Sequence, residues 1–320
     1  FTRLLRKHKD RKGAGRQLPF LSLSAARMTE DGEKRKRILL SLSIPAFLLI
    51  VIFMIVPLGN ALRVSFFKWN GYSQKMKFIG LKNYRSLFSD KVFWRSTVNT
   101  FIYGFGSTLL QNIMGLSAAI FVNKEFKGRN FVRLILYMPI MISGVIMGAI
   151  QYYIFNYENG VLNNILNLFG VGNIYWMETG PRAVMIITLI NSWQAMGFCM
   201  LIYLAGLQNI PKMYQEAALL DGATKRQIFF KVKLPLLMPA VTTAVITNLI
   251  GGFKLYDIIV TLTNGGPNRK SLSLSYYISL LYFSDEKAGY SSAVGIALFV
   301  IIFLVAVPIN HYLRSREVEY

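Results

Sequence analysis

The stretch EAALLDGATKRQIFFKVKLP, residues 216–235, decides the fold because it lies between two long apolar segments. In its second half Ile228, Phe229 and Val232 recur at helical spacing, while basic residues occupy the other faces, which predicts a surface helix. Gly222 interrupts the pattern ahead of this helix, and glycine reaches backbone angles that a side chain forbids. The spacing therefore predicts a helical hairpin that packs on another element.

The composition of the chain indicates a membrane protein. Hydrophobic residues make up 53% of the 320 residues and charged residues only 16%, whereas soluble domains carry roughly one quarter charged residues. Crossing the hydrocarbon core takes about twenty apolar residues in a helix. Five uncharged stretches are long enough, namely 38–62, 97–122, 134–155, 183–207 and 293–313.

A sixth segment, 236–262, is also long enough but contains Lys254 and Asp257. Six spans make an all-α integral membrane protein with both termini on one side. The segments on the same side of the membrane as the amino terminus hold about twice as many Lys and Arg residues as the segments on the other side. Because such residues are retained in the cytoplasm, this bias predicts cytoplasmic termini. The predicted parts are a basic tail (1–37), a six-span domain (38–313) that contains the loop 208–235, and a short carboxyl-terminal tail (314–320).

The sequence does not support several classes of function. The net charge of +21 includes a basic amino-terminal tail just before the first span, where retention in the cytoplasm and contact with anionic lipid explain the charge, so no nucleic-acid partner is expected. Cys199 is the only cysteine, and neither an HExxH pattern nor a cluster of acids and histidines is present, so no metal site is expected. No phosphate-binding GxxxxGK[ST] loop occurs, so any ATP is expected on another polypeptide.

Within the stretch 216–235, a set of positions resembles the signature loop of permease subunits of ABC importers. Three further stretches look like the carbohydrate-uptake branch of that family: ENGVLNNILNLFG (158–170), AGLQNIPKMYQEAALLDGA (205–223) and TLTNGGPNRKS (261–271). The resemblance spans roughly residues 40–313. The positions that fill the signature are Glu216, Ala217, Ala218, Gly222, Val232, Leu234 and Pro235.

The resemblance implies a type I ABC importer permease fold with a cytoplasmic coupling-helix hairpin. Such a chain is one half of a two-subunit pore in a bacterial cytoplasmic (inner) membrane, and it is not itself an enzyme. The implied partners are a second, different permease chain, two ABC ATPase subunits that bind ATP and Mg²⁺, membrane lipid, and an extracytoplasmic solute-binding protein that delivers the sugar. The residues implied in ATPase coupling are Glu216, Ala217, Ala218, Asp221, Gly222, Ile228 and Phe229.

Polar and aromatic residues inside two spans match the cavity-lining stretches of sugar permeases. Amide groups and aromatic faces are the chemical types that bind sugar hydroxyls and C–H surfaces. Small polar residues also join helices to one another in membranes, and this alternative stays open. The predicted substrate-path residues are Asn191, Gln194, Phe198, Asn248, Gly252, Lys254, Leu255 and Tyr256.

Lys254 has two interpretations. It can pair with Asp257 across one helical turn, which lowers the cost of a charge at membrane depth. Alternatively it faces the cavity and meets an acidic substrate such as a uronic oligosaccharide. Gly144 and Gly148 form a small-xxx-small pair, which predicts close packing against another helix or the partner subunit.

The expected function is therefore ATP-driven, binding-protein-dependent import of sugars, above all oligosaccharides. A secondary transporter would also show six spans with buried polar residues, and an ABC permease for a non-sugar solute would share the hairpin, so both are alternatives. A membrane-embedded glycosyltransferase would need a convergent acidic or metal-binding cluster in a loop, and the acids of the predicted outside loops are scattered.

Overall fold

The computed structural model describes residue 41 and residues 43–318, and the chain divides into two compact units, 1–60 and 61–320. The first apolar helix runs from Ser43 to Val64 and contains the π-helical segment η1 (Val51–Ile55) and the α-helix α2 (Val56–Val64). None of the side chains in its most apolar window is buried within the chain. The predicted basic tail 1–37 lies outside the described residues.

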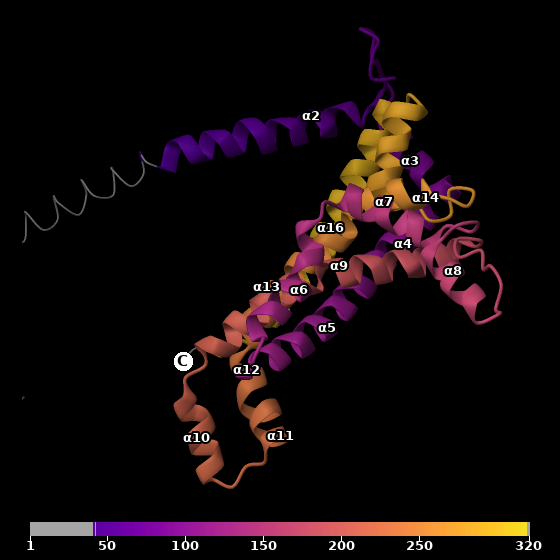
Figure 1. The fold of residues 1–320 in the computed structure, drawn as a ribbon. Helices are drawn as coiled ribbons and strands as arrows, with labels where there is room; N and C mark the ends of the chain where they lie inside the picture. The colour runs from indigo at the N-terminus through magenta and orange to yellow at the C-terminus, as the bar shows by residue number, and fades with distance from the viewer. Residues whose placement is uncertain (1–40, 42, 319–320) are drawn as a thin grey trace, which may run out of the picture. The chain divides into compact units, whose positions relative to one another are not determined.

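Helices dominate residues 61–320, as the sequence predicts (Figure 1). Two short strands, β1 (Phe67–Lys68) and β2 (Lys77–Phe78), pair antiparallel with Phe67 opposite Phe78. The other elements are α3 (Lys82–Ser89), α4 (Lys91–Phe101), η2 (Ile102–Gly106), α5 (Ser107–Val122), α6 (Arg129–Met141), α7 (Gly144–Phe155), α8 (Val161–Leu168), α9 (Gly180–Asn209), α10 (Lys212–Leu220), α11 (Lys225–Ile228), η3 (Phe229–Lys233), α12 (Leu234–Leu236), α13 (Met238–Phe253), α14 (Asp257–Thr263), α15 (Leu274–Ser279), η4 (Leu280–Ser284) and α16 (Ala288–Arg314).

In the described part of the chain, four helices are long and apolar enough to cross a membrane: Ser43–Val64, Lys91–Val122, Gly180–Asn209 and Ala288–Arg314. Two bent helix pairs bring the number to six if each counts as one span. One pair joins α6 to α7 at 98°, and the other joins Lys225–Leu236 to α13 at 66°. The last three unbroken spans begin before the predicted uncharged stretches, because their first turns carry charged or polar residues.

The prediction of one continuous helix over 134–155 is wrong. The helix stops at Met141, and α7 restarts at Gly144 after an extended residue, Ile142, and a cap, Ser143, whose hydroxyl accepts a hydrogen bond from the Ile146 amide. The carbonyl released at Ile142 accepts a hydrogen bond from Gln194 Nε2 at 2.9 Å. A hydropathy pattern records apolar length but not chain direction, so it could not reveal this break.

The prediction of a helix over 236–262 is also wrong. Helix α13 ends at Phe253, residues 254–256 are not helical, and α14 begins at Asp257. Gly251 and Gly252 immediately precede the break, and glycine is a poor residue for a helix interior. The Leu255 carbonyl is satisfied by the Ser273 hydroxyl at 2.6 Å.

Helix α9 links the two hydrophobic cores of residues 61–320. Its first half contributes to a core that it shares with residues of α4, α14, α15 and the first half of α16, and Ile187 is fully buried there. Its second half packs with α5, α6 and α13, where Met200 is fully buried. The hairpin helices α10 and α11 lie at one end of this bundle, and α3, α8 and α14 lie at the other (Figure 1).

The predicted close contact at Gly144 and Gly148 is confirmed, and its partner is α14. A Cβ atom at Gly144 would lie 2.8 Å from the Asp257 Cβ atom, and one at Gly148 would collide with the Thr261 side chain. Any larger residue at Gly148 would therefore push α7 away from α14. The contact joins α7 to a short helix within the chain rather than to another full span.

The loop between α14 and α15 is held by side chains of the second span. Asn99 Nδ2 donates to the carbonyl oxygens of Lys270 at 2.8 Å and Leu272 at 2.9 Å. The Tyr103 hydroxyl donates to the Ser271 carbonyl at 2.8 Å. Asn99 and Tyr103 are one helical turn apart, so one face of the second span fixes the position of the loop.

We expect Asn99→Ala to destabilise the protein by about 2 kcal/mol, because it leaves two carbonyl groups without their donor. The measurement is the thermal unfolding midpoint of the purified protein in detergent, with Asn164→Ala on the exposed face of α8 as the matched control. Equal midpoints for the two variants would contradict this role of Asn99.

Candidate functional site

The hairpin predicted from residues 216–235 is present. Helix α10 ends at Leu220, and Gly222 adopts φ +75°, a left-handed conformation that favours glycine. The Asp221 amide donates to the Ala217 carbonyl at 3.0 Å, and the Ala223 amide donates to the Ala218 carbonyl at 2.9 Å. These bonds close the carboxyl end of α10 and turn the chain toward α11.

A capping box starts the second arm of the hairpin. The Thr224 amide donates to Gln227 Oε1 at 2.8 Å, and the Gln227 amide donates to the Thr224 hydroxyl at 3.3 Å. The T-x-x-Q spacing was the sequence signal for this helix start, and our sequence analysis missed it. The cap and the Gly222 turn together give the hairpin a defined shape.

The predicted coupling residues differ in their exposure. Ala218 and Phe229 are half-buried, and Ile228 is buried at 6% exposure, so Ile228 packs within this chain. Leu219 is 58% exposed and Leu220 is 90% exposed, although the sequence analysis did not single them out. The exposed members of the predicted set are Glu216, Ala217, Asp221 and Gly222.

The substrate-path residues predicted on α9 have different surroundings. Gln194 is buried, and its side chain donates a hydrogen bond to the Ile142 carbonyl at the break between α6 and α7. Asn191 is half-buried, and its backbone carbonyl accepts a hydrogen bond from Gln111 Nε2 at 3.2 Å. Phe198 is half-buried. Asn191 and Phe198 thus keep part of their surface free of this chain.

The predicted residues on α13 lie mainly in helix contacts. Asn248 is buried and hydrogen-bonds through Nδ2 to the Cys199 sulfur on α9. Gly252 lies so close to η2 that a Cβ atom there would be 2.8 Å from the Gly104 Cα atom. Both positions join helices of this chain, which is the alternative that the sequence left open.

The break after α13 carries the remaining three predicted residues. Leu255 is buried in the core, and Tyr256 is half-buried with its ring 5.5 Å from the Tyr276 ring. Lys254 is exposed. Within the described residues Lys254 forms no ion pair with Asp257, so the predicted pairing is wrong. The spacing i,i+3 brings side chains together only in a continuous helix, and the break separates them.

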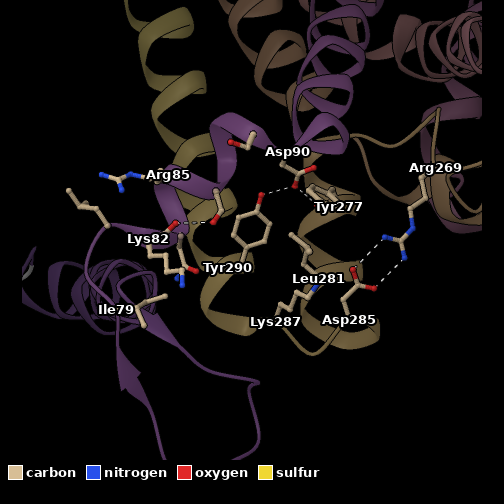
Figure 2. Close-up of a pocket in the computed structure, with 14 residues that line it drawn as sticks. Ile79, Lys82, Arg85, Asp90, Arg269, Tyr277, Leu281, Asp285, Lys287 and Tyr290 are labelled. Atoms are coloured by element: carbon tan, nitrogen blue, oxygen red, sulfur yellow. Dashed lines mark hydrogen bonds and ion pairs between the residues drawn. The ribbon is translucent and has the colours of Figure 1, made fainter.

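A pocket of about 1010 Å³ lies at the end of the bundle opposite the hairpin, between α3, the start of α16 and the end of η4 (Figure 2). On one wall Arg269 pairs with Asp285 at 3.2 Å. On another wall the hydroxyl groups of Tyr277 and Tyr290 both donate to Asp90 Oδ2 at 2.6 Å. The sequence does not predict this pocket, because its residues come from segments far apart in the chain.

Asp90 caps α4 and accepts hydrogen bonds from the amides of Val92 and Phe93. Burial alone would raise the pKa of this carboxyl, but the two tyrosine hydroxyls and the two amides together lower its pKa below the usual value. Asp90 is thus an ionised, fully bonded part of the wall. Among the described residues, no ion pair is formed by the other cations that line the pocket, Lys82, Arg85 and Lys287.

Comparisons with known proteins identify the family. A family model described as "Binding-protein-dependent transport system inner membrane component" matches residues 111–317. The trehalose/maltose transport system permease protein of Thermococcus litoralis is 34% identical over 259 residues, which cover 81% of this chain and 88% of the relative. The sulfoquinovosyl glycerol transport system permease protein of Agrobacterium fabrum is 33% identical over 274 residues, covering 85% and 89%.

The fold agrees with a solved importer. The crystal structure of a bacterial ABC transporter involved in the import of the acidic polysaccharide alginate contains a chain that matches with a TM-score of 0.76 and 25% identity. The match covers 90% of this chain and 99% of that chain. The protein therefore belongs to the family of inner membrane components of binding-protein-dependent transport systems, the permeases of ABC importers.

Proposed function

We propose that this chain is a permease subunit of an ATP-driven importer of saccharides, above all oligosaccharides. The support is its likeness, over more than four fifths of its length, to permeases whose names specify trehalose/maltose and sulfoquinovosyl glycerol transport. The fold match to the alginate importer adds a structural neighbour that imports a saccharide. A secondary transporter would not need a hairpin that docks on an ATPase subunit.

The observation that carries the mechanism is the apolar tip of the hairpin. Leu219 and Leu220 lie exposed beside Asp221 and Gly222, and Glu216 is exposed on the same helix. Apolar side chains held out at a capped turn suit insertion into a cleft of another subunit. In this proposal the ATPase subunits bind ATP and Mg²⁺, and this chain binds no nucleotide and catalyses no reaction.

Closure of the ATPase pair would move the hairpin as one rigid body. Ile228 is buried and Phe229 half-buried, so both would transmit the movement from α11 to the bundle. Helix α13 follows η3 and α12 directly after a 66° bend, so a displaced hairpin would tilt α13. Tilting of α13 against its neighbours would open the path alternately to each side of the membrane.

The proposed role of the hairpin implies an orientation and a set of partners. If it lies in the cytoplasm, both termini lie there too, and the Asp90 pocket faces the outside. The free cations Lys82, Arg85 and Lys287 would then meet acidic groups of a solute-binding protein. A second permease, which we expect to be a different chain, would complete the pore.

Four predicted path residues retain surface that the second permease and the substrate can share. Asn191, Phe198 and Tyr256 are half-buried, and Lys254 is exposed. The buried residues Gln194, Asn248, Gly252 and Leu255 would shape the path by holding helices and breaks in place.

An acidic oligosaccharide is the second candidate substrate. Lys254 supports it, because an exposed ammonium group without an ion pair among the described residues can bind a carboxylate.

The test of the proposed function is uptake of labelled saccharides into proteoliposomes that contain the full importer and its binding protein. ATP-dependent uptake of at least one saccharide, at a rate that falls when this chain is omitted, is the expected result. Uptake of non-sugar solutes alone, or uptake without ATP, would contradict the proposal.

Gly222→Val is expected to reduce ATP-dependent uptake about tenfold or more while the chain stays in the membrane and the ATPase still hydrolyses ATP. The space around Gly222 is open, so the effect comes from forcing a β-branched residue into a positive φ. Gly222→Asn is the matched control, because asparagine tolerates this conformation, and it should retain most uptake. Normal coupled uptake by the valine variant would refute the lever role.

Lys254→Ala is expected to lower uptake of a uronic trisaccharide and to leave uptake of maltotriose unchanged, if the second candidate is right. The measurement compares both sugars in the same proteoliposomes, with Lys231→Ala on the hairpin side as a control for lost charge. Unchanged uptake of both sugars by the Lys254 variant would remove the acidic-substrate idea.

A further inference from the structure

Two of the stretches that resemble sugar permeases, 158–170 and 261–271, meet at one pocket. It has a volume of about 500 Å³, within the range of roughly 300–1,000 Å³ that small-molecule sites occupy. It lies between the carboxyl end of α7, the loops that flank α8, and the carboxyl end of α14 with the loop that follows it. Figure 1 shows α8 and α14 at the same end of the bundle. We call it the α8 pocket; its lining is Tyr152, Phe155, Asn156, Tyr157, Glu158, Tyr175, Trp176, Met177, Leu262, Thr263, Gly266 and Pro267.

One buried side chain holds two walls of the α8 pocket together. Asn163 is fully buried, and its Nδ2 donates to the carbonyl oxygens of Tyr157 at 2.9 Å and Ile174 at 3.0 Å. Its Oδ1 accepts the Trp176 indole N–H at 2.9 Å. Asn163 therefore fixes the segment before α8 against the segment after it and sets the direction of the indole. These bonds give the two walls a fixed geometry.

Aromatic rings dominate the lining. Phe155 and Trp176 pack edge to face with ring centroids 5.8 Å apart, and Tyr157 and Tyr175 do so at 5.3 Å. Tyr157 is 45% exposed and Tyr175 is 55% exposed, so these two keep ring surface for a ligand. Tyrosines at membrane interfaces also form belts that face lipid. Tyrosines in such a belt do not enclose a cavity, whereas Tyr157 and Tyr175 line the α8 pocket.

The charged and polar groups of the lining select the ligand class. Glu158 is exposed, and its carboxylate forms no ion pair among the described residues. Among the residues that the structure describes, the pocket has no lysine or arginine in its lining. A carboxylate and tyrosine hydroxyls accept hydrogen bonds from sugar hydroxyl groups, while aromatic faces pack against sugar C–H surfaces. A uronate would instead meet the negative charge of Glu158.

We propose that the α8 pocket binds a neutral saccharide ring before it reaches the path between the spans. This inference rests on the proposed function in saccharide import, and it adds a second binding place and a preference for neutral rings. Tyr157 and Tyr175 supply the stacking surfaces, Glu158 accepts hydroxyl hydrogens, and Asn163 is a positioning residue. The sequence stretch 158–170 would thus have a binding role distinct from the hairpin and from the α13–α14 break.

The test measures direct binding of maltotriose and of a uronic trisaccharide to the assembled importer in nanodiscs, without binding protein, by saturation-transfer NMR. Wild type should bind maltotriose more tightly than the uronic sugar. The double variant Tyr157→Ala/Tyr175→Ala should weaken maltotriose binding by about tenfold. Glu158→Gln should narrow the difference between the two sugars. The matched control is Phe169→Ala, an exposed aromatic residue that follows α8 and does not line the pocket.

The proposal is overturned if the double variant binds maltotriose as tightly as the Phe169→Ala variant does. It is also overturned if the wild-type importer transports maltotriose but, in the absence of the binding protein, does not bind it. Unchanged maltotriose binding with weakened docking of the binding protein would overturn it too, and would make the pocket a protein contact. Failure of the proposed function is a separate result, because wild-type proteoliposomes would then take up no saccharide.

Discussion

A backbone that leaves its helix at membrane depth must find its hydrogen bonds within the protein, because hydrocarbon offers none. This chain meets that constraint with buried side chains. Gln194 donates a hydrogen bond to the backbone of the α6–α7 break, and Ser273 donates one to the backbone of the α13–α14 break. The broken spans can therefore exist only as part of the folded bundle, and the irregular segments that shape the path depend on a few polar contacts.

The same constraint divides the polar residues of the spans into two groups. Asn248 and Gln194 have the chemistry of sugar ligands, yet both are occupied inside the chain. Asn191 and Lys254 retain surface that this chain leaves exposed, and both belong to the proposed substrate path. Buried amides that hold the scaffold and half-exposed groups that face a cavity are indistinguishable in sequence, because both are polar residues in apolar helices.

Sequence patterns predict the helical class, the hairpin and the family, because spacing and signature residues are local properties. They do not predict where a span breaks, since hydropathy over 134–155 or 236–262 carries no information on chain direction. The helical spacing of Ile228 marks an apolar face, but it does not say whether that face meets this chain or a partner. The α8 pocket is not predicted from the sequence either, since Asn163 joins segments that come into contact only in the folded structure.

The central claim is that the capped hairpin is a cytoplasmic contact for an ATPase. The chain has one cysteine, Cys199, which is fully buried, so Cys199→Ser with Leu220→Cys gives a single reactive thiol at the hairpin tip. Thiol crosslinking in the assembled importer, combined with an impermeant maleimide added to either side of the membrane, tests the claim directly. We expect a crosslink to the ATPase subunit and labelling from the cytoplasmic side only. Labelling from the outside, or no crosslink to an ATPase, would contradict it.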